Sequence, residues 1–201
     1  MATMLGYFLT DLKLAPGVAQ ELLSKANEVS FNMISVDGDS STNDCAFLMA
    51  SGESRVELAN DQDYKLFKAA LTEVAQVLAQ SIAADGEGAT KLIEVNLTGS
   101  PKLDLARKAA RGVTMSPLIK TAVHGEDPNW GRILSRLGAE QVPASALAKM
   151  SLKLQGVLIF ENGAPMVFDR NQVRQLLKSA KVKVEIDLKS GTESAVAWGC
   201  D

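Results

Sequence analysis

The stretch Ala2-Thr3-Met4-Leu5-Gly6, followed by Tyr7-Phe8-Leu9-Thr10-Asp11, is the part of the chain around which the rest is organised. A small residue, a threonine and a mostly apolar run are typical of the start of a buried β-strand. Thr3 therefore has two interpretations. It is an ordinary β-branched strand residue, or it is a nucleophile whose own backbone amine serves as general base.

The nucleophile interpretation requires Thr3 to be the first residue of its chain, and Met1 and Ala2 precede it. An α-amino group has a pKa of about 7.7–8.0, so a fraction of it is free to accept a hydroxyl proton at neutral pH. No histidine or aspartate base is then needed. The chain contains a single histidine, which makes this mechanism relevant.

Composition excludes several classes of protein. The 201 residues suffice for one domain or two small lobes with a core. A net charge of −3 with scattered basic residues disfavours nucleic acid binding, and no apolar run or leader pattern indicates a membrane span or export. Cys45 and Cys200 are too few for a disulfide framework, and with one histidine they supply no ordinary zinc site. We expect a cytoplasmic protein with no metal and no membrane or nucleic acid partner.

Hydrophobic periodicity predicts mixed strands and helices without a repeat or linker. Strands are expected at residues 5–11, 45–50, 91–98, 117–123, 150–155, 157–161, 182–188 and 194–198. Helices are expected at residues 18–29, 61–84, 101–111, 130–137 and 169–179. This order favours the α+β class in layers, with two lobes that divide near residues 86–100.

Three polar segments are candidates for chemistry. The loop at residues 37–44 resembles a calcium loop but has Thr42 where glycine is required and Leu48 where a bidentate glutamate is required. It is either a turn-rich loop that satisfies its own backbone or a polar rim above a pocket. Gly86-Glu87-Gly88 is either a solvated turn or a place where the backbone closely approaches a ligand.

The third segment, residues 124–132, holds a histidine, two carboxylates, an asparagine, a tryptophan and an arginine. Its structural interpretation is that Asp127 and Pro128 cap a helix that Trp130 anchors in the core. Its functional interpretation is that Arg132, on the first turn, binds a carboxylate.

Together these stretches resemble one family, the second (β) chain of ornithine acetyltransferase, the bifunctional glutamate N-acetyltransferase of arginine biosynthesis. The resemblance covers essentially the whole chain and rests on motifs that are specific in combination. They are Ala2-Thr3-Met4-Leu5-Gly6, Asp37-Gly38-Asp39-Ser40-Ser41-Thr42-Asn43-Asp44, Gly86-Glu87-Gly88-Ala89-Thr90-Lys91 and Gly125-Glu126-Asp127-Pro128-Asn129-Trp130-Gly131-Arg132.

The resemblance implies that a precursor cleaves itself between Ala2 and Thr3 and that Thr3 becomes the catalytic nucleophile. An acetyl group passes from N-acetylornithine to glutamate through acetyl-threonine, and acetyl-CoA is a second donor in many members. Thr3 and Glu87 match substrate-binding residues. No cofactor is implied. An oxyanion-hole Thr-Gly pair belongs to the first chain, and a further C-terminal tail follows the Ala-Trp-Gly-Cys-Asp stretch in the family.

The resemblance also implies an assembly and a fold. The two chains form a heterodimer, usually paired into a heterotetramer. The fold is a layered α/β sandwich of the aminopeptidase and ornithine acetyltransferase type with a smaller C-terminal α/β lobe. Residues 1–90 would belong to the catalytic sandwich, completed by the first chain, and residues 91–201 to the C-terminal lobe.

Two alternatives stay open. A self-cleaving aminopeptidase would use the same N-terminal device with water as acceptor, and would release amino acid without acetyl transfer. A non-catalytic subunit would only complete a partner's site, and would tolerate replacement of Thr3.

Overall fold

The structure is a computed structural model that describes residues 3–201, and the chain packs as two compact units. Unit 1 comprises residues 1–32 and 39–79, and unit 2 comprises residues 33–38 and 80–201. The division at residue 90 that the resemblance implies stays a prediction.

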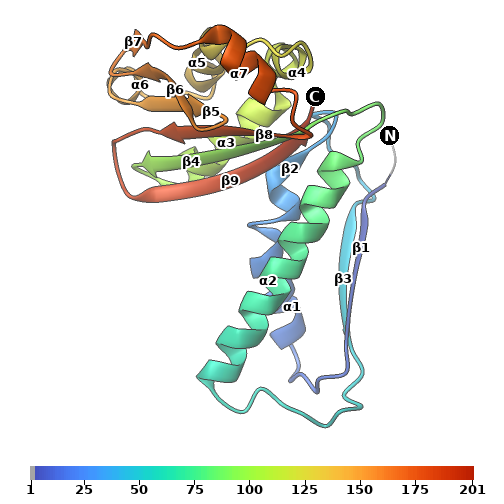
Figure 1. Ribbon diagram of the computed structural model, residues 1–201. Helices are drawn as coiled ribbons and strands as arrows, with labels where there is room; N and C mark the ends of the chain where they lie inside the picture. The colour runs from blue at the N-terminus through green and yellow to red at the C-terminus, as the bar shows by residue number, and fades with distance from the viewer. Residues whose placement is uncertain (1–2) are drawn as a thin grey trace. The chain divides into compact units, whose positions relative to one another are not determined.

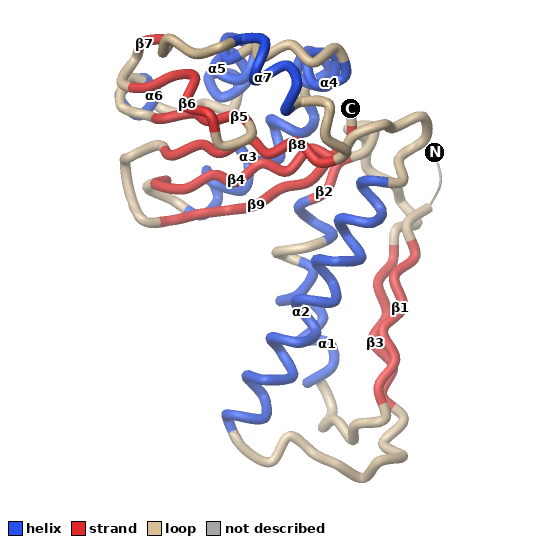
Figure 2. Tube along the Cα trace, in the orientation of Figure 1, coloured by secondary structure: helices blue, strands red, loops and turns tan. Residues whose placement is uncertain are grey.

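Unit 1 is built on two parallel strands. Strand β1 (Leu5–Thr10) pairs with β3 (Cys45–Ala50), with Leu5 opposite Cys45 and Thr10 opposite Ala50. Parallel strands need a crossover connection, which here contains helix α1 (Val18–Asn27). Helix α2 (Asp61–Ala84) follows β3, and Figure 2 shows the two strands side by side.

Burial alternates along β1, as expected for a strand with one covered face. Gly6 and Phe8 are buried, and the ring of Phe8 lies 6.1 Å from the ring of Phe31, centroid to centroid. A Cβ atom on Gly6 would lie 3.3 Å from the Phe31 ring, so this position favours glycine. The covered face of the strand is thus closely packed.

The opposite face of the same two strands is apolar and exposed. We call it the β1–β3 apolar face; it consists of Leu5, Tyr7 and Leu9 from β1 and Phe47 and Met49 from β3. The exposed fraction reaches 76% at Leu9, and the rings of Tyr7 and Phe47 stack at 5.3 Å. In the described chain β1 pairs with β3 alone, so the buried strand expected from the sequence is covered here on one face only.

Unit 2 is a seven-stranded mixed sheet with the strand order β2-β9-β4-β8-β5-β6-β7. Helix α3 (Leu103–Met115) packs on β4 and β9 (Figure 1). Helices α4 (Pro117–His124) and α5 (Trp130–Ala139) pack beside α3. Strands β4 and β8 are parallel, whereas β9 runs antiparallel to β4. The bounds of these strands are β2 (Ile34–Ser35), β4 (Leu92–Ser100), β5 (Ser151–Leu154), β6 (Val157–Glu161), β7 (Ala164–Pro165), β8 (Lys181–Asp187) and β9 (Glu193–Cys200).

The remaining helices are α4 (Pro117–His124), α5 (Trp130–Ala139), the short α6 (Ala144–Leu147) and α7 (Arg170–Leu176), with a 3-10 turn at Phe31–Met33. Asp169 caps α7, since its carboxylate accepts from the backbone N–H groups of Asn171 and Gln172. The sheets and helices confirm the expected layered α+β architecture.

The predicted strand at residues 117–123 is wrong, because this segment is helix α4. Pro117 occupies the first helical turn, where its missing N–H costs nothing. Ile119, Ala122 and Val123 are the buried residues, at the spacing of a helix face. The apolar, β-branched composition favoured a strand, and tertiary packing overrode it.

Candidate active site

Thr3 lies directly before β1 and is exposed. The neighbouring backbone is fixed by the polar loop, because the Met4 N–H donates to Asp44 Oδ1 at 2.9 Å and the Met4 carbonyl accepts from the Cys45 N–H at 2.9 Å. The end of the loop at residues 37–44 therefore lies beside the start of β1. Ala2, and with it the expected cleavage bond, lies outside the described residues.

Glu87 stands at the tip of a tight turn in unit 2. The Ala89 N–H donates to the Gly86 carbonyl at 2.9 Å, which makes Glu87 and Gly88 the two central residues of the turn. Gly88 has φ +75°, the value that favours glycine at the third position of a type II turn. Glu87 is exposed, so this geometry presents its carboxylate to solvent or to a ligand. Thr3 and Glu87 belong to different compact units.

Asp201, which follows β9, holds the residues that leave the Glu87 turn. Its Oδ1 accepts from the backbone N–H groups of Thr90 and Lys91 at 2.7 and 2.8 Å, and its Oδ2 accepts from Thr90 Oγ1 at 2.5 Å. His124 Nδ1 lies 2.9 Å from Oδ2. The Asp201 side chain is 1% exposed, yet all of these contacts are polar.

The ionised form of Asp201 is strongly favoured. Burial alone would raise the pKa of this carboxyl, but the hydrogen bonds from Thr90, His124 and Lys91 outweigh burial and lower its pKa from 3.8 to about 2. The group is therefore a carboxylate throughout the physiological range, and it carries a fixed negative charge beside the Glu87 turn.

Lys91 connects the same turn to the end of helix α4. Its Nζ donates to the carbonyls of Val123 and His124 at 2.9 and 3.2 Å, and to Glu126 Oε1 at 2.7 Å. A cation is stabilised at a helix C-terminus, where carbonyls are unpaired. The hydrogen bond from Lys91 lowers the pKa of the Glu126 carboxyl, which favours its ionised form.

Residues of the segment 124–132 contact other parts of the described chain, and the role of Arg132 as a carboxylate binder stays a prediction. Asn129, rather than Asp127, caps α5 by accepting from the Arg132 N–H at 3.1 Å. The Arg132 guanidinium donates to the Leu118 carbonyl at 2.6 Å and to Thr121 Oγ1 at 3.0 Å. These two hydrogen bonds link the start of α5 to α4. Trp130 stacks on Phe160 with ring centroids 5.2 Å apart, which places it against the core as predicted.

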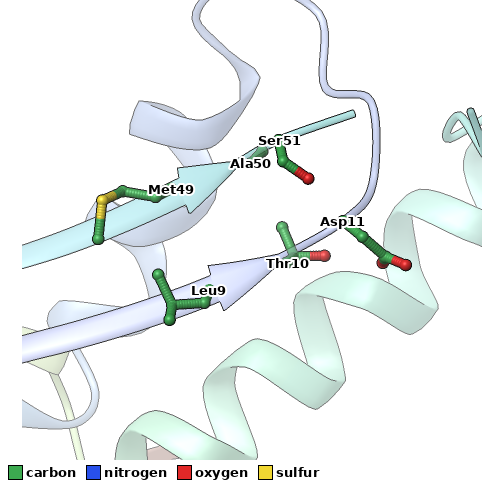
Figure 3. A pocket seen from close by; sticks show the side chains of 6 residues that line it. All are labelled: Leu9, Thr10, Asp11, Met49, Ala50 and Ser51. Atoms are coloured by element: carbon green, nitrogen blue, oxygen red, sulfur yellow. The ribbon is translucent and has the colours of Figure 1, made fainter. Parts of the chain in front are cut away.

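A separate hollow of about 630 Å³ lies at the carboxyl ends of β1 and β3 (Figure 3). Thr10, Asp11 and Ser51 supply polar groups there, and Leu9, Met49 and Ala50 complete its lining. Thr3 precedes the other end of β1, so this hollow is not the expected site of the nucleophile.

Within residues 3–201, no three His, Cys, Asp or Glu side chains come together in a way that could hold a metal ion. In the same range, no helix has the length and apolar character needed to cross a membrane.

The ArgJ family matches the chain over residues 1–201. The chain belongs to the ArgJ family. It is 46% identical over 203 residues to the Arginine biosynthesis bifunctional protein ArgJ of Lactococcus lactis, covering 100% of this chain and 51% of that protein. It is 41% identical over 203 residues to the protein of the same name from Bacillus cereus, covering 100% and 50%. The chain thus spans about half the length of the curated ArgJ relatives it matches.

A crystal structure of Arginine biosynthesis bifunctional protein argJ from Bacillus halodurans superposes with a TM-score of 0.94 and 37% identity. The match covers 99% of this chain and 94% of that chain. The layered α/β fold expected from the sequence is therefore the fold of an ArgJ protein.

The sequence motifs of this ArgJ chain indicate Thr3 and Glu87 as site residues, but they do not indicate Asp201. Thr90 and Asp201 are 111 positions apart, and no local pattern indicates their contact. The sequence offers one indirect signal. Thr90 and Lys91, the last two residues of the Gly86–Lys91 motif, are polar residues that follow a turn.

Proposed function

We propose that this chain is the β chain of a glutamate N-acetyltransferase of the ornithine acetyltransferase type, and that Thr3 carries the acetyl group. The observation that supports the proposal is the match to the ArgJ family along residues 1–201, with the Thr3 and Glu87 motifs both present. Curated relatives bear the name of bifunctional proteins of arginine biosynthesis.

The chemistry would be acyl transfer in two half-reactions. Thr3 Oγ attacks the acetyl carbonyl carbon of N-acetylornithine, the C–N bond breaks, and ornithine leaves with the hydroxyl proton. The amine of glutamate then attacks acetyl-threonine, which releases N-acetylglutamate and restores the hydroxyl. The Thr3 amine, freed by cleavage after Ala2, would act as the base, and acetyl-CoA would be an alternative donor. An oxyanion hole on the first chain would supply roughly 3–4 kcal/mol per donor.

Glu87 would bind a substrate ammonium group, such as the side-chain ammonium that N-acetylornithine keeps when its α-nitrogen is acetylated. Glu87 stands in a turn that the Ala89 N–H to Gly86 carbonyl hydrogen bond closes and in which Gly88 permits φ +75°, so the turn presents its carboxylate to a cationic ligand. Donor and acceptor would use the same pocket in turn, as a ping-pong reaction requires.

The partner would be a first chain from the same precursor. This chain matches 94% of the solved ArgJ chain from Bacillus halodurans but only about half of the curated relatives, which favours an ArgJ protein made of two chains. The β1–β3 apolar face supports the same proposal, because large exposed apolar patches mark interaction surfaces. We propose a heterodimer paired into a heterotetramer in the cytoplasm, with residues 1–90 in the catalytic sandwich and residues 91–201 in the C-terminal lobe.

The test is co-expression of this chain in its precursor context with the remaining half of the ArgJ sequence. The wild type should be cleaved before Thr3 and should convert N-acetylornithine and glutamate into ornithine and N-acetylglutamate. Thr3→Ala should give an uncleaved, inactive protein by intact mass and activity assay. Thr10→Ala, at the far end of β1, is the matched control. Normal cleavage and transfer in Thr3→Ala would favour the interpretation of this chain as a structural subunit. Release of amino acid by the wild type without acetyl transfer would indicate an aminopeptidase.

A further inference from the structure

The Glu87 turn is held at both ends by the end of strand β9. On the exit side, Asp201 accepts three hydrogen bonds from Thr90 and Lys91, and the Asp201 N–H donates to the Lys91 carbonyl at 3.2 Å. On the entry side, Gly86 packs on Cys200, since a Cβ atom at Gly86 would lie 2.8 Å from Cys200 Sγ. Two consecutive residues, Cys200 and Asp201, therefore hold both ends of the segment at residues 86–91.

The contacts of Asp201 restrain the turn in direction as well as in distance. Its two oxygens receive a backbone donor and a hydroxyl donor from the same residue, Thr90, which leaves little freedom to rotate that residue. Hydrogen bonds to an ionised carboxylate are about twice as strong as neutral ones. An asparagine here would offer one acceptor oxygen and two hydrogens in place of two acceptor oxygens.

The exposed end of the turn has no such restraint of its own. Glu87 and Gly88 are both exposed, and the space around a Cβ atom at Gly88 is open to 4 Å. The direction of the Glu87 carboxylate therefore depends on the clamped ends of the turn. Even a displacement of about 1 Å can cost a hundredfold in rate when a group must meet a substrate.

We propose that Asp201 is a positioning residue for Glu87: through Thr90 and Lys91 it sets the direction in which the Glu87 carboxylate meets the substrate ammonium. This inference rests on the proposed function for its readout in activity. Asp201 does not itself touch substrate. Its effect passes through the turn, so it should vanish when Glu87 can no longer bind a cation.

The experiment is a double-mutant cycle in the two-chain protein with N-acetylornithine and glutamate as substrates. Asp201→Ala should lower kcat/KM roughly tenfold in the wild-type background and less than about twofold in the Glu87→Gln background. Thr90→Val should show part of the same loss, and Thr90→Ser, which keeps the hydroxyl, should restore it. Asp169→Ala is the matched control, because it removes the cap of α7 and should lower the melting temperature without coupling to Glu87.

Amide hydrogen exchange of residues 86–91 gives a readout that does not need substrate. Asp201→Ala should speed exchange at Thr90 and Lys91, whose N–H groups lose their acceptor. If Asp201→Ala does not fold, Thr90→Val replaces it in the kinetic cycle, since this variant removes only the hydroxyl bond and leaves both backbone bonds to the carboxylate.

The possible results distinguish a failure of this inference from a failure of the proposed function. Equal losses in the wild-type and Glu87→Gln backgrounds would overturn the inference, and so would faster exchange with unchanged kcat/KM. Absence of acetyl transfer by the unaltered two-chain protein would overturn the proposed function instead. In that case unchanged exchange in Asp201→Ala would still overturn the clamp, and faster exchange would support it.

Discussion

The hydrogen-bond network around Asp201 makes a pH-dependent contribution to stability whose sign is fixed. The pKa of this carboxyl is about 2 when folded and near 3.8 otherwise, so its contribution is complete above pH 4 and is lost as the pH falls from 4 towards 2. At about 1.4 kcal/mol per pH unit, the loss should total about 2 kcal/mol. The free energy of unfolding of the two-chain protein, measured in urea at fixed concentration between pH 5 and 2, should fall more steeply for the wild type than for Asp201→Asn. Equal slopes would contradict this account.

Glu87 gives a second prediction at the residue scale. If its carboxylate pairs with a substrate ammonium in a partly desolvated pocket, Glu87→Gln should weaken binding by roughly 1.5–3 kcal/mol, or about ten- to a hundredfold. Steady-state kinetics of both half-reactions would measure the effect. Asp85→Asn is the matched control, because Asp85 is also exposed and lies just before the turn. Unchanged kinetics in both half-reactions for Glu87→Gln would leave only the interpretation as a solvated turn.

At the scale of elements, the contact of the Glu87 turn with the end of β9 should limit substitution. Gly86→Ala would place a Cβ atom 2.8 Å from Cys200 Sγ and 3.1 Å from Val36 Cγ1, which should cost about 1–3 kcal/mol through overpacking. Cys200→Ala in the same chain should restore part of the melting temperature. Gly88→Ala is the comparison: it has open space but φ +75°, so it should be destabilised by strain alone and not rescued by Cys200→Ala. Rescue of both variants would argue against a contact at Gly86.

The helices and strands also show which parts of the fold can be predicted from the sequence and which cannot. The predicted strand at residues 45–50 and helix at residues 61–84 match β3 and α2 to the residue, because a continuous apolar run and a long helical period are strong local signals. α4 was predicted as a strand because Ile119 and Val123 are β-branched, and its burial depends on packing beside α3 and α5. The Asp201 contacts depend on the pairing of β9 with β4, which no local pattern encodes.

At the scale of the whole molecule, the β1–β3 apolar face predicts poor behaviour of the isolated chain. Residues 1–201 purified alone should self-associate, because the face exposes large apolar side chains and β1 has a free edge in the described chain. The restored two-chain protein should not. Size-exclusion chromatography with light scattering would compare the two preparations. A monomeric isolated chain with full acetyl transfer would refute this account.

A single charge should locate the surface responsible. Leu9→Lys places an ammonium on the β1–β3 apolar face, where the exposed fraction of Leu9 is 76%, and should reduce self-association of the isolated chain while weakening its association with the first chain. Leu118→Lys is the matched control, since Leu118 is 57% exposed on α4, away from β1 and β3 in sequence and element. Equal effects of the two variants would mean that no particular surface is responsible.

The pairing of β4 with both β8 and β9 also bears on the time at which this chain can fold. The two partners of β4 are made after the other strands of the described sheet, and Asp201 follows Lys91 by 110 positions. At about 5–20 residues per second, a ribosome would need roughly 5 to 20 s to synthesise the intervening chain. Until β8 and β9 have been made, β4 lacks both of its partners, and contacts between residues so distant in sequence form slowly. A nascent chain would thus acquire the contacts that hold the Glu87 turn only after β9 and Asp201 have left the ribosome, long after the segment that begins with Thr3.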